Sequence, residues 1–359
     1  MQETNPNTAY LYKLNESTHP RGKDSAVPIS NSCNRPWRTV SIDAYTNCMI
    51  CICDGWLPVP VGEITDFNCL EQIWDNPRAH VIQNDIQQKK YTWCAVDHCG
   101  IAQRSYDEPR YQLIFGIDDS CNLECPSCRR EKIMHNSGQL YEKKLRAVQH
   151  TVDLLNQFEE PIHITLASSG DPLASHIYRP LLHSYRGRPN QTFTLFTNGL
   201  LIKKQLDRTA IIDQIREYRI SVDAGSAEVY HKVRRGGSWS VLMENFEFLQ
   251  QNRRQARVNL MYIVQRTNYQ DIENFVKLCQ QFGFQGVLTQ LDDWGTWNRT
   301  ASPTPDAWEI KNGTFLDHDV LNPTHQDHAH CKKILSQVYQ SKPHGIFFSP
   351  RLTQLTTNE

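Results

Sequence analysis

Three cysteines stand close together near the middle of the chain: Cys121, Cys125 and Cys128, within the sequence IFGIDDSCNLECPSCRREK. The spacing C-x3-C-x2-C puts three thiols on one short segment, which suits an iron–sulfur cluster better than a disulfide pair. A [4Fe–4S] cluster has four irons and usually takes four cysteine ligands. Three ligands leave one iron open for a substrate or cofactor, by the logic that leaves a position open on a catalytic zinc. A zinc knot is the main alternative interpretation.

The element that must position these cysteines is the segment before them. Residues 111–117, YQLIFGI, are predicted to form a buried strand, so the cysteines follow its C-terminal end. In α/β barrels the chemistry is built at that end of the strands.

From residue 111 onward, strand and helix patterns alternate, which predicts an α/β fold with a parallel sheet and crossover helices. The expected strands are YQLIFGI, IHITLA, FTLFT, YRISVDA, RVNLMYIV and GVLTQL. The expected helices span roughly residues 138–157, 173–185, 201–216, 239–252 and 270–282.

A cysteine triplet of this spacing after a first strand resembles the radical SAM enzymes, and six strands match their partial (β/α)6 barrel. The resemblance implies that the open iron binds S-adenosyl-L-methionine, which is cleaved to a 5′-deoxyadenosyl radical that abstracts a substrate hydrogen atom. It also implies an external low-potential electron donor of the flavodoxin or ferredoxin type. One departure is visible: Ser127 replaces the aromatic residue that usually precedes the third cysteine.

Further expected cofactor ligands follow the later strands. Ser169, Gly170, Asp171 and Pro172 stand where the family has a Gly-Gly-Glu-Pro segment that binds the ammonium group of the cofactor. A turn that caps a helix is the alternative interpretation of these four residues. Asn198 follows the third strand in a turn sequence at the same end of the sheet.

The fourth strand carries Ser221, and Arg234 follows about a dozen residues later. The resemblance implies that this pair holds the ribose and carboxylate of the cofactor, with Arg235 as a rival one residue away. A bidentate, permanently charged guanidinium suits a carboxylate. After the fifth strand, Gln265 and Asn268 could point into the barrel, and Asn268 could equally cap a helix.

Two carboxylates follow the sixth strand. Asp292 and Asp293 are the expected catalytic residues, since either could accept a proton from the substrate. Trp294 and Trp297 are expected to wall the pocket. An ordinary turn is the alternative for the two aspartates.

A second group of cysteines precedes the barrel sequence. It resembles the SPASM/twitch auxiliary-cluster domain through Cys33, the Pro36-Trp37 pair, a cysteine-rich hairpin, the Ile73-Trp74 helix and a final cysteine pair. The resemblance implies one auxiliary [4Fe–4S] cluster, with Cys53 as a near alternative to Cys51 in this ligand set: Cys33, Cys51, Cys94 and Cys99. A structural zinc ribbon is the alternative, in which His80 or His98 could also act as a ligand.

Composition limits the remaining choices. The formal net charge is −1 and 21% of residues are charged, so neither nucleic acid nor a membrane surface is an expected partner. The N-terminal residues lack the apolar core of a secretory signal. In a reducing cytoplasm, 12 cysteines point to metal or redox chemistry rather than disulfides.

The expected organisation is a polar tail at 1–30, the auxiliary domain at 31–106, the barrel at 107–345 and a C-terminal tail at 346–359. The expected activity is oxidation or other modification of a peptide or protein. A dehydrogenase or epimerase of a sugar-like or aminocyclitol-like small molecule is one alternative, and a non-catalytic, zinc-stabilised binding protein is another.

Overall fold

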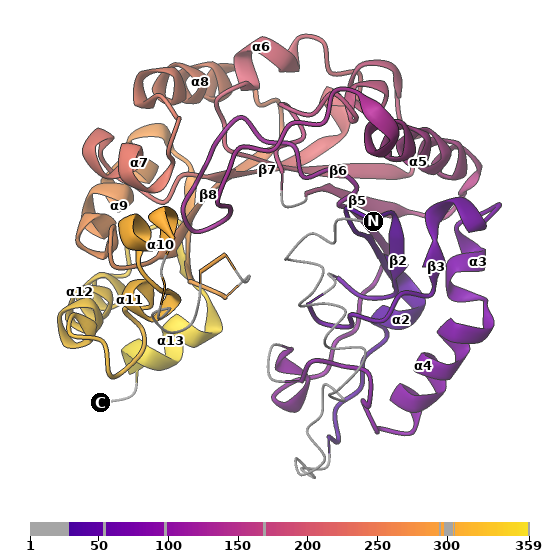
Figure 1. Ribbon diagram of the computed structural model, residues 1–359, viewed down its shortest axis with the longest axis horizontal. Helices are drawn as coiled ribbons and strands as arrows, with labels where there is room; N and C mark the ends of the chain where they lie inside the picture. The colour runs from indigo at the N-terminus through magenta and orange to yellow at the C-terminus, as the bar shows by residue number, and fades with distance from the viewer. Residues whose placement is uncertain are drawn as a thin grey trace. The chain divides into compact units, whose positions relative to one another are not determined.

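The computed structural model describes residues 29–52, 55–96, 99–167, 170–293, 296–297, 304 and 306–357 (Figure 1). They form two compact units. The first contains the described residues of Met1–Ser120, Met134–Leu195 and Arg208–Ile215, and the second those of Cys121–Ile133, Phe196–Asp207 and Arg216–Glu359. These units cut across the expected boundary at residue 106, and the domains expected from the sequence remain predictions.

The sheet of the first unit has the strand order β3-β2-β1-β4-β5-β6. Its strands are β1 (Thr39–Ile42), β2 (Asn47–Met49), β3 (Gly62–Glu63), β4 (Tyr111–Phe115), β5 (Ile162–Leu166) and the first residues of β6 (Gln191–Thr197). Strands β1, β4, β5 and β6 are parallel, with Val40 opposite Leu113, whereas β2 and β3 pair antiparallel. The cysteine-rich N-terminal segment therefore adds strands to the sheet that contains β4.

Helices cover this sheet through apolar faces. In α5 (Gly138–Gln157), Ala147, Val148, Thr151, Leu154 and Leu155 are buried, at the spacing of one helical face. The short helices α2 (Arg35–Arg38), α3 (Glu71–Trp74) and α4 (Pro77–Gln87) pack together (Figure 1).

An aromatic cluster ties the N-terminal segment to the first strand of the barrel. The ring of Trp74 lies 5.1 Å from Tyr111 and 6.3 Å from Phe158, measured between ring centroids. The indole Nε1–H of Trp74 also donates to the carbonyl of Thr39 at 3.0 Å. The predicted Ile73-Trp74 helix is thus anchored to both β4 and the start of β1.

In the second unit, β7 (Ile215–Ser221, of which Ile215 belongs to the first unit), β8 (Arg257–Val264), β9 (Gln285–Gln290) and β10 (Ile346–Phe348) follow one another in the sheet. The pairs within this set are all parallel. The helices of this unit are α6 (Ile202–Leu206), α7 (Ala227–Val233), α8 (Trp239–Asn252), α9 (Ile272–Phe282), α10 (Ala307–Asn312), α11 (Phe315–His318), α12 (His328–Ser341) and α13 (Pro350–Thr357).

All six expected strands are present as β4 to β9, and the helices expected at 138–157 and 239–252 have those bounds. The helix expected at 173–185 is wrong: turns replace it except for a π-helical turn at Pro180–Ser184, where proline supplies no N–H to a preceding turn. The helix expected at 201–216 is too long. It ends at Leu206, and the N–H of Ala210 bonds instead to the carbonyl of Leu182 at 2.7 Å.

The tail expected from residue 346 is also wrong over the described residues. Ile346–Phe348 form β10 against β9, and α13 follows to Thr357 with Leu352 fully buried. Pro350 begins this helix, a position where its missing N–H costs nothing. The tail expected at 1–30 falls almost entirely outside the described residues. Each described helix is too short or too polar to span a lipid bilayer.

Candidate active site

The cysteine triplet lies on a loop closed by backbone hydrogen bonds. The N–H of Cys121 donates to the carbonyl of Ile133 at 2.9 Å. The N–H groups of Cys128 and Arg129 both donate to the carbonyl of Cys125, at 2.9 and 3.1 Å, which folds this stretch into a single turn. Cys121 and Cys125 are buried, at 8% and 5% exposure, whereas Cys128 is exposed.

Each of the three sulfurs has a different donor side chain beside it. The distances to Sγ are 3.7 Å from Arg234 Nη1 to Cys125, 3.6 Å from Arg129 Nη2 to Cys128, and 3.8 Å from Asn198 Nδ2 to Cys121. The N–H of Leu123 adds a contact of 3.4 Å to Cys121 Sγ. Donors aimed at sulfur fit thiolate ligands of a cluster, whose reduction potential they adjust.

Burial raises the pKa of the Cys125 thiol to about 11, and the guanidinium of Arg234 opposes this rise. Metal binding requires the thiolate, so a bound metal must supply the free energy of deprotonation. Arg129 was not predicted from the sequence as a site residue. Its position directly after Cys128 could have indicated this role, since a cation beside a cysteine ligand favours the thiolate.

Arg234 also forms a buried ion pair. Its Nη2 atom lies 2.5 Å from Asp223 Oδ2, and Asp223 is only 1% exposed. The other carboxylate oxygen of Asp223 accepts the N–H of Ile263 at 2.8 Å. Burial raises the pKa of Asp223 above its ordinary value, against the effect of Arg234.

The backbone of Asp223 has a φ of +55°, a conformation that non-glycine residues adopt at a cost. Asp223 lies two residues after Ser221, which is the half-buried last residue of β7. Of the two arginines considered from the sequence, Arg234 contacts the triplet, whereas Arg235 donates to Asn312 Oδ1 at 2.9 Å.

The segment after β5 is packed against the residues that precede the triplet. The N–H of Asp171 donates to the carbonyl of Ser120 at 2.8 Å. A Cβ atom on Gly170 would lie 2.5 Å from that same carbonyl oxygen, so only glycine fits. Asp171 Oδ1 accepts the N–H of Leu173 at 2.9 Å, which makes its turn-capping role visible. Ser169 lies outside the described residues, and binding of a cofactor at Gly170 and Asp171 remains a prediction.

Asp292 and Asp293 follow β9 and are both half-buried. Gln290 Nε2 lies 3.5 Å from Asp292 Oδ2. Their catalytic role remains a prediction. Trp294 lies outside the described residues.

Trp297 is 4% exposed, and its ring stacks on His318 with centroids 4.5 Å apart. Next to it, Thr296 Oγ1 donates to the carbonyl of Cys128 at 3.1 Å. The side chain of Asn268, which could point into the barrel by the sequence prediction, forms hydrogen bonds with backbone atoms instead. Its Nδ2 donates to the carbonyls of Asp223 and Ile263, both at 2.9 Å.

The N-terminal cysteines surround a cavity within the first unit. Its lining includes all four cysteines of the ligand set predicted with Cys51: Cys33, Cys51, Cys94 and Cys99. Arg35, Trp56, Leu57 and Tyr91 also contribute to this lining. Four thiols around one cavity fit a cluster with a complete set of protein ligands. Cys53 and His98 lie outside the described residues, and His80 pairs with Asp75 at 2.9 Å on the surface.

Burial disfavours the thiolate form of the cysteines that line this cavity, so a bound metal would have to supply the free energy of deprotonation. Burial raises the pKa of Cys51 to about 12, and neighbouring cysteines add to the rise. Burial likewise raises the pKa values of Cys33, Cys94 and Cys99. Arg35 is held beside the cavity by Glu108, at 2.8 Å, and by the ring of Tyr106, 3.8 Å from its guanidinium carbon.

Residues 118–279 match the model of the Radical SAM superfamily. This part of the chain, with its sheet of parallel strands and its cysteine loop, belongs to that superfamily. The match begins at Asp118 and so contains the whole triplet.

Two curated relatives are similar to this chain over about half of its length. A GTP 3′,8-cyclase of Alkaliphilus metalliredigens is 28% identical over 165 residues, covering 45% of this chain and 50% of the relative. The mycofactocin maturase MftC of Mycobacterium ulcerans is 23% identical over 209 residues, covering 58% and 53%. The chain thus spans about half the length of the curated relatives it matches.

Among solved structures, anSMEcpe with bound AdoMet matches with 16% identity and a TM-score of 0.44, covering 66% of this chain and 60% of that one. Streptococcus suis SuiB bound to precursor peptide SuiA matches with 12% identity and a TM-score of 0.42, covering 76% and 62%.

Proposed function

We propose that this chain is a radical SAM enzyme whose site cluster is held by Cys121, Cys125 and Cys128. The observation that carries the proposal is that each of these sulfurs has its own donor side chain. Two guanidinium groups beside the sulfurs would stabilise the negative charge of a thiolate-ligated metal centre. Three local cysteines would leave one iron of a [4Fe–4S] cluster open for a cofactor. When bound, the cluster and S-adenosyl-L-methionine together supply a 5′-deoxyadenosyl radical that takes a hydrogen atom from the substrate.

The protein residues have binding and positioning roles in this proposal. Arg234 holds the cofactor carboxylate, and Ser221 the ribose. Gly170 and Asp171 present a close-packed backbone and a carboxylate to the ammonium group, together with Ser169, and Asn198 completes the cofactor site beside Cys121. Asp292 or Asp293 accepts a proton from the substrate.

The second part of the proposal concerns the N-terminal cysteines. Cys33, Cys51, Cys94 and Cys99 hold an auxiliary [4Fe–4S] cluster, supported by the cavity that all four line. When bound, such a cluster would supply an electron acceptor for the substrate radical, which would make the overall change a two-electron oxidation. The site cluster would need an external low-potential donor of the flavodoxin or ferredoxin type. We place the enzyme in the cytoplasm, where low-potential donors and reduced thiols are found.

The proposed substrate is a peptide or protein, since enzymes with this N-terminal cysteine pattern often modify one, and one matching relative is named a maturase. The second candidate is oxidation or epimerisation of a sugar-like or aminocyclitol-like small molecule. The match to a GTP 3′,8-cyclase favours keeping it, because that relative is named for a small molecule.

The test is anaerobic reconstitution with iron and sulfide, followed by reduction in the presence of S-adenosyl-L-methionine. We expect a brown protein with about eight irons per chain, as two [4Fe–4S] clusters require, and formation of 5′-deoxyadenosine. A colourless protein that binds zinc and forms no 5′-deoxyadenosine would support the zinc-stabilised binding protein instead. Stimulation of cofactor cleavage by candidate peptides or by aminocyclitols then separates the two substrate classes.

A further inference from the structure

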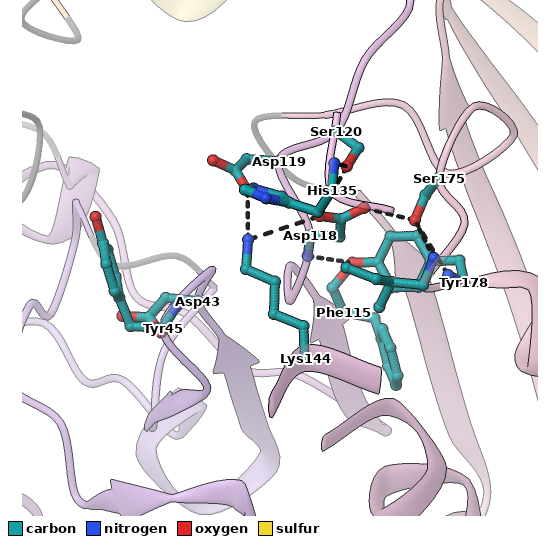
Figure 2. Close-up of polar contacts among 11 residues, drawn as sticks. Asp43, Tyr45, Phe115, Asp118, Asp119, Ser120, His135, Lys144, Ser175 and Tyr178 are labelled. Atoms are coloured by element: carbon teal, nitrogen blue, oxygen red, sulfur yellow. Dashed lines mark hydrogen bonds and ion pairs between the residues drawn. The ribbon is translucent and has the colours of Figure 1, made fainter. Parts of the chain in front are cut away.

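A buried lysine lies beneath the start of the cysteine loop. Lys144 belongs to α5 and is 2% exposed. Its Nζ atom makes a short contact with Asp119 Oδ1 and lies 3.6 Å from Asp118 Oδ1. Figure 2 shows the lysine side chain reaching from the helix toward both carboxylates. Asp118 is 1% exposed and the Asp119 side chain is 15% exposed, so one buried and one partly buried carboxylate meet one ammonium group here.

The charged group of Lys144, Asp118 and Asp119 joins the two ends of the cysteine loop, residues 121–133. Asp118, Asp119 and Ser120 directly precede Cys121, whereas His135 directly follows Met134 at the far end of the loop. His135 Nε2 lies 2.9 Å from Asp119 Oδ1, and the His135 N–H donates to Ser120 Oγ at 2.9 Å. Both contacts lie within the first unit, and together they close the neck of the loop (Figure 2).

Asp118 also forms hydrogen bonds with the segment that follows β5. Ser175 Oγ donates to Asp118 Oδ2 at 2.5 Å, and Tyr178 Oη accepts the N–H of Asp118 at 3.2 Å (Figure 2). Gly170 and Asp171 rest on the backbone of residues 118–120, as described above. One ionic cluster therefore fixes the neck of the cysteine loop against the segment proposed to bind the cofactor ammonium group.

A metal ion is the obvious alternative occupant. Among the described residues, Asp118, Asp119 and His135 form a group whose ligand atoms all lie within 4.8 Å of one another. The ammonium group of Lys144 already contacts both carboxylates, however, and supplies the positive charge that a cation would bring.

Stability alone does not explain the cluster. Buried ion pairs can often be replaced by apolar residues without loss of stability, because removing charges from water costs about as much as their attraction returns. The contacts of Lys144 with two adjacent carboxylates are directional, and they fix the position of residues 118–120 more than they stabilise the fold.

We propose that Lys144, Asp119 and His135 are positioning residues. They hold the two ends of the cysteine loop, residues 118–120 and His135, together and against the segment of Gly170 and Asp171. The inference rests on the proposed function, because it assumes a cluster on the triplet. None of the three residues is proposed to contact the cofactor.

The test uses reconstituted full-length protein and three variants. The double variant Asp119→Asn/Lys144→Met removes one positive and one negative charge together. Asp118 keeps the hydroxyl donors of Ser120 and Ser175 in this variant. His135→Ala removes only the contact at the far end of the loop, from a residue that is partly exposed. Lys143→Met is the matched control, since Lys143 is the preceding residue of α5 but pairs with Glu63 at the surface.

We expect the double variant and His135→Ala to lower the rate of 5′-deoxyadenosine formation about 10- to 100-fold, as loss of supporting contacts around metal ligands commonly does. The KM for S-adenosyl-L-methionine should rise, and the change that this cofactor causes in the electron paramagnetic resonance spectrum of the reduced site cluster should weaken or disappear. Lys143→Met should match the wild type in all three measurements.

Two results separate the failures. If folded His135→Ala or the folded double variant keeps the wild-type spectrum, KM and rate, the positioning role is wrong while the proposed function stands. If wild-type protein itself holds no site cluster after reconstitution, the proposed function fails first, and the role of Lys144 fails with it.

Discussion

The Nη1 atom of Arg234 lies 3.7 Å from Cys125 Sγ, while the Nη2 atom of the same guanidinium pairs with Asp223 at 2.5 Å. One planar group thus links a cysteine of the triplet to a buried carboxylate on the loop after β7. The positive φ of Asp223 indicates that the backbone accepts strain to keep this arrangement. Arg234 therefore joins the cysteine loop to the loop after β7, and its binding of the cofactor carboxylate remains a prediction.

Replacing Arg234 tests this double role. Arg234→Gln should reduce stability by about 3 kcal/mol, because it leaves the buried Asp223 without its cation. Arg234→Lys should not restore cofactor binding, since an ammonium group cannot reach two partners through a rigid fork. The KM for S-adenosyl-L-methionine and the melting temperature are the measurements. A lysine variant with wild-type KM would contradict the assignment.

Replacing Cys121, Cys125 and Cys128 together with Ala should abolish 5′-deoxyadenosine formation and remove roughly half of the iron, since one of two [4Fe–4S] clusters is lost. Iron analysis and chromatography of the reaction mixture check both effects. Cys69→Ala is the control, because Cys69 belongs to neither predicted ligand set. Continued cofactor cleavage by the triple variant would end the radical SAM interpretation.

The auxiliary site is tested by Cys94→Ala. If the cavity holds a cluster, this variant should lose roughly half of the iron and leave the site cluster in place. Cys48→Ala serves as the comparison, since Cys48 is fully buried in β2 but does not line the cavity. Unchanged iron together with one bound zinc in the wild type would favour the zinc ribbon.

Gly170→Ala should impair cofactor binding by steric means. The added Cβ would lie 2.5 Å from the carbonyl oxygen of Ser120, so the backbone must move away from residues 118–120. We expect a higher KM for S-adenosyl-L-methionine. Gly138→Ala separates this effect from strain, since Gly138 has a φ of +88° but no atom within 4 Å of its Cβ position. It should lower the melting temperature without changing KM.

His318 should make stability depend on pH. Burial lowers the pKa of His318, and its Nε2 atom lies 2.5 Å from the carbonyl of Asn312. The folded protein therefore resists protonation more than the unfolded chain, whose histidines titrate near about 6.5. The stabilisation is present above that pH and is lost as the pH falls below it. Melting temperatures from pH 7 to 5 should fall more steeply for the wild type than for His318→Gln; parallel curves would refute the assignment.

The sequence alone determined the order of the strands along the chain and the place of the cysteine triplet after the first of them. Alternation of apolar strands with amphipathic helices was enough to place six strands, because burial on a parallel sheet demands continuous apolar runs. The C-x3-C-x2-C spacing was enough to find the triplet, because it places three thiols on one loop. The parts that failed were marked by prolines and by polar interruptions, as at residues 173–185, where local hydrogen bonds override periodicity.

Tertiary structure decided the partners. Nothing in the spacing says that Arg129 and Arg234 contact different sulfurs, or that a helix lysine lies under the loop neck. Cys33 and Cys99 also come to line one cavity only when the chain folds. These contacts join residues far apart in the chain, and their geometry depends on which faces the strands and helices present. A pattern of residue types records which chemistry is available, whereas packing determines which groups meet.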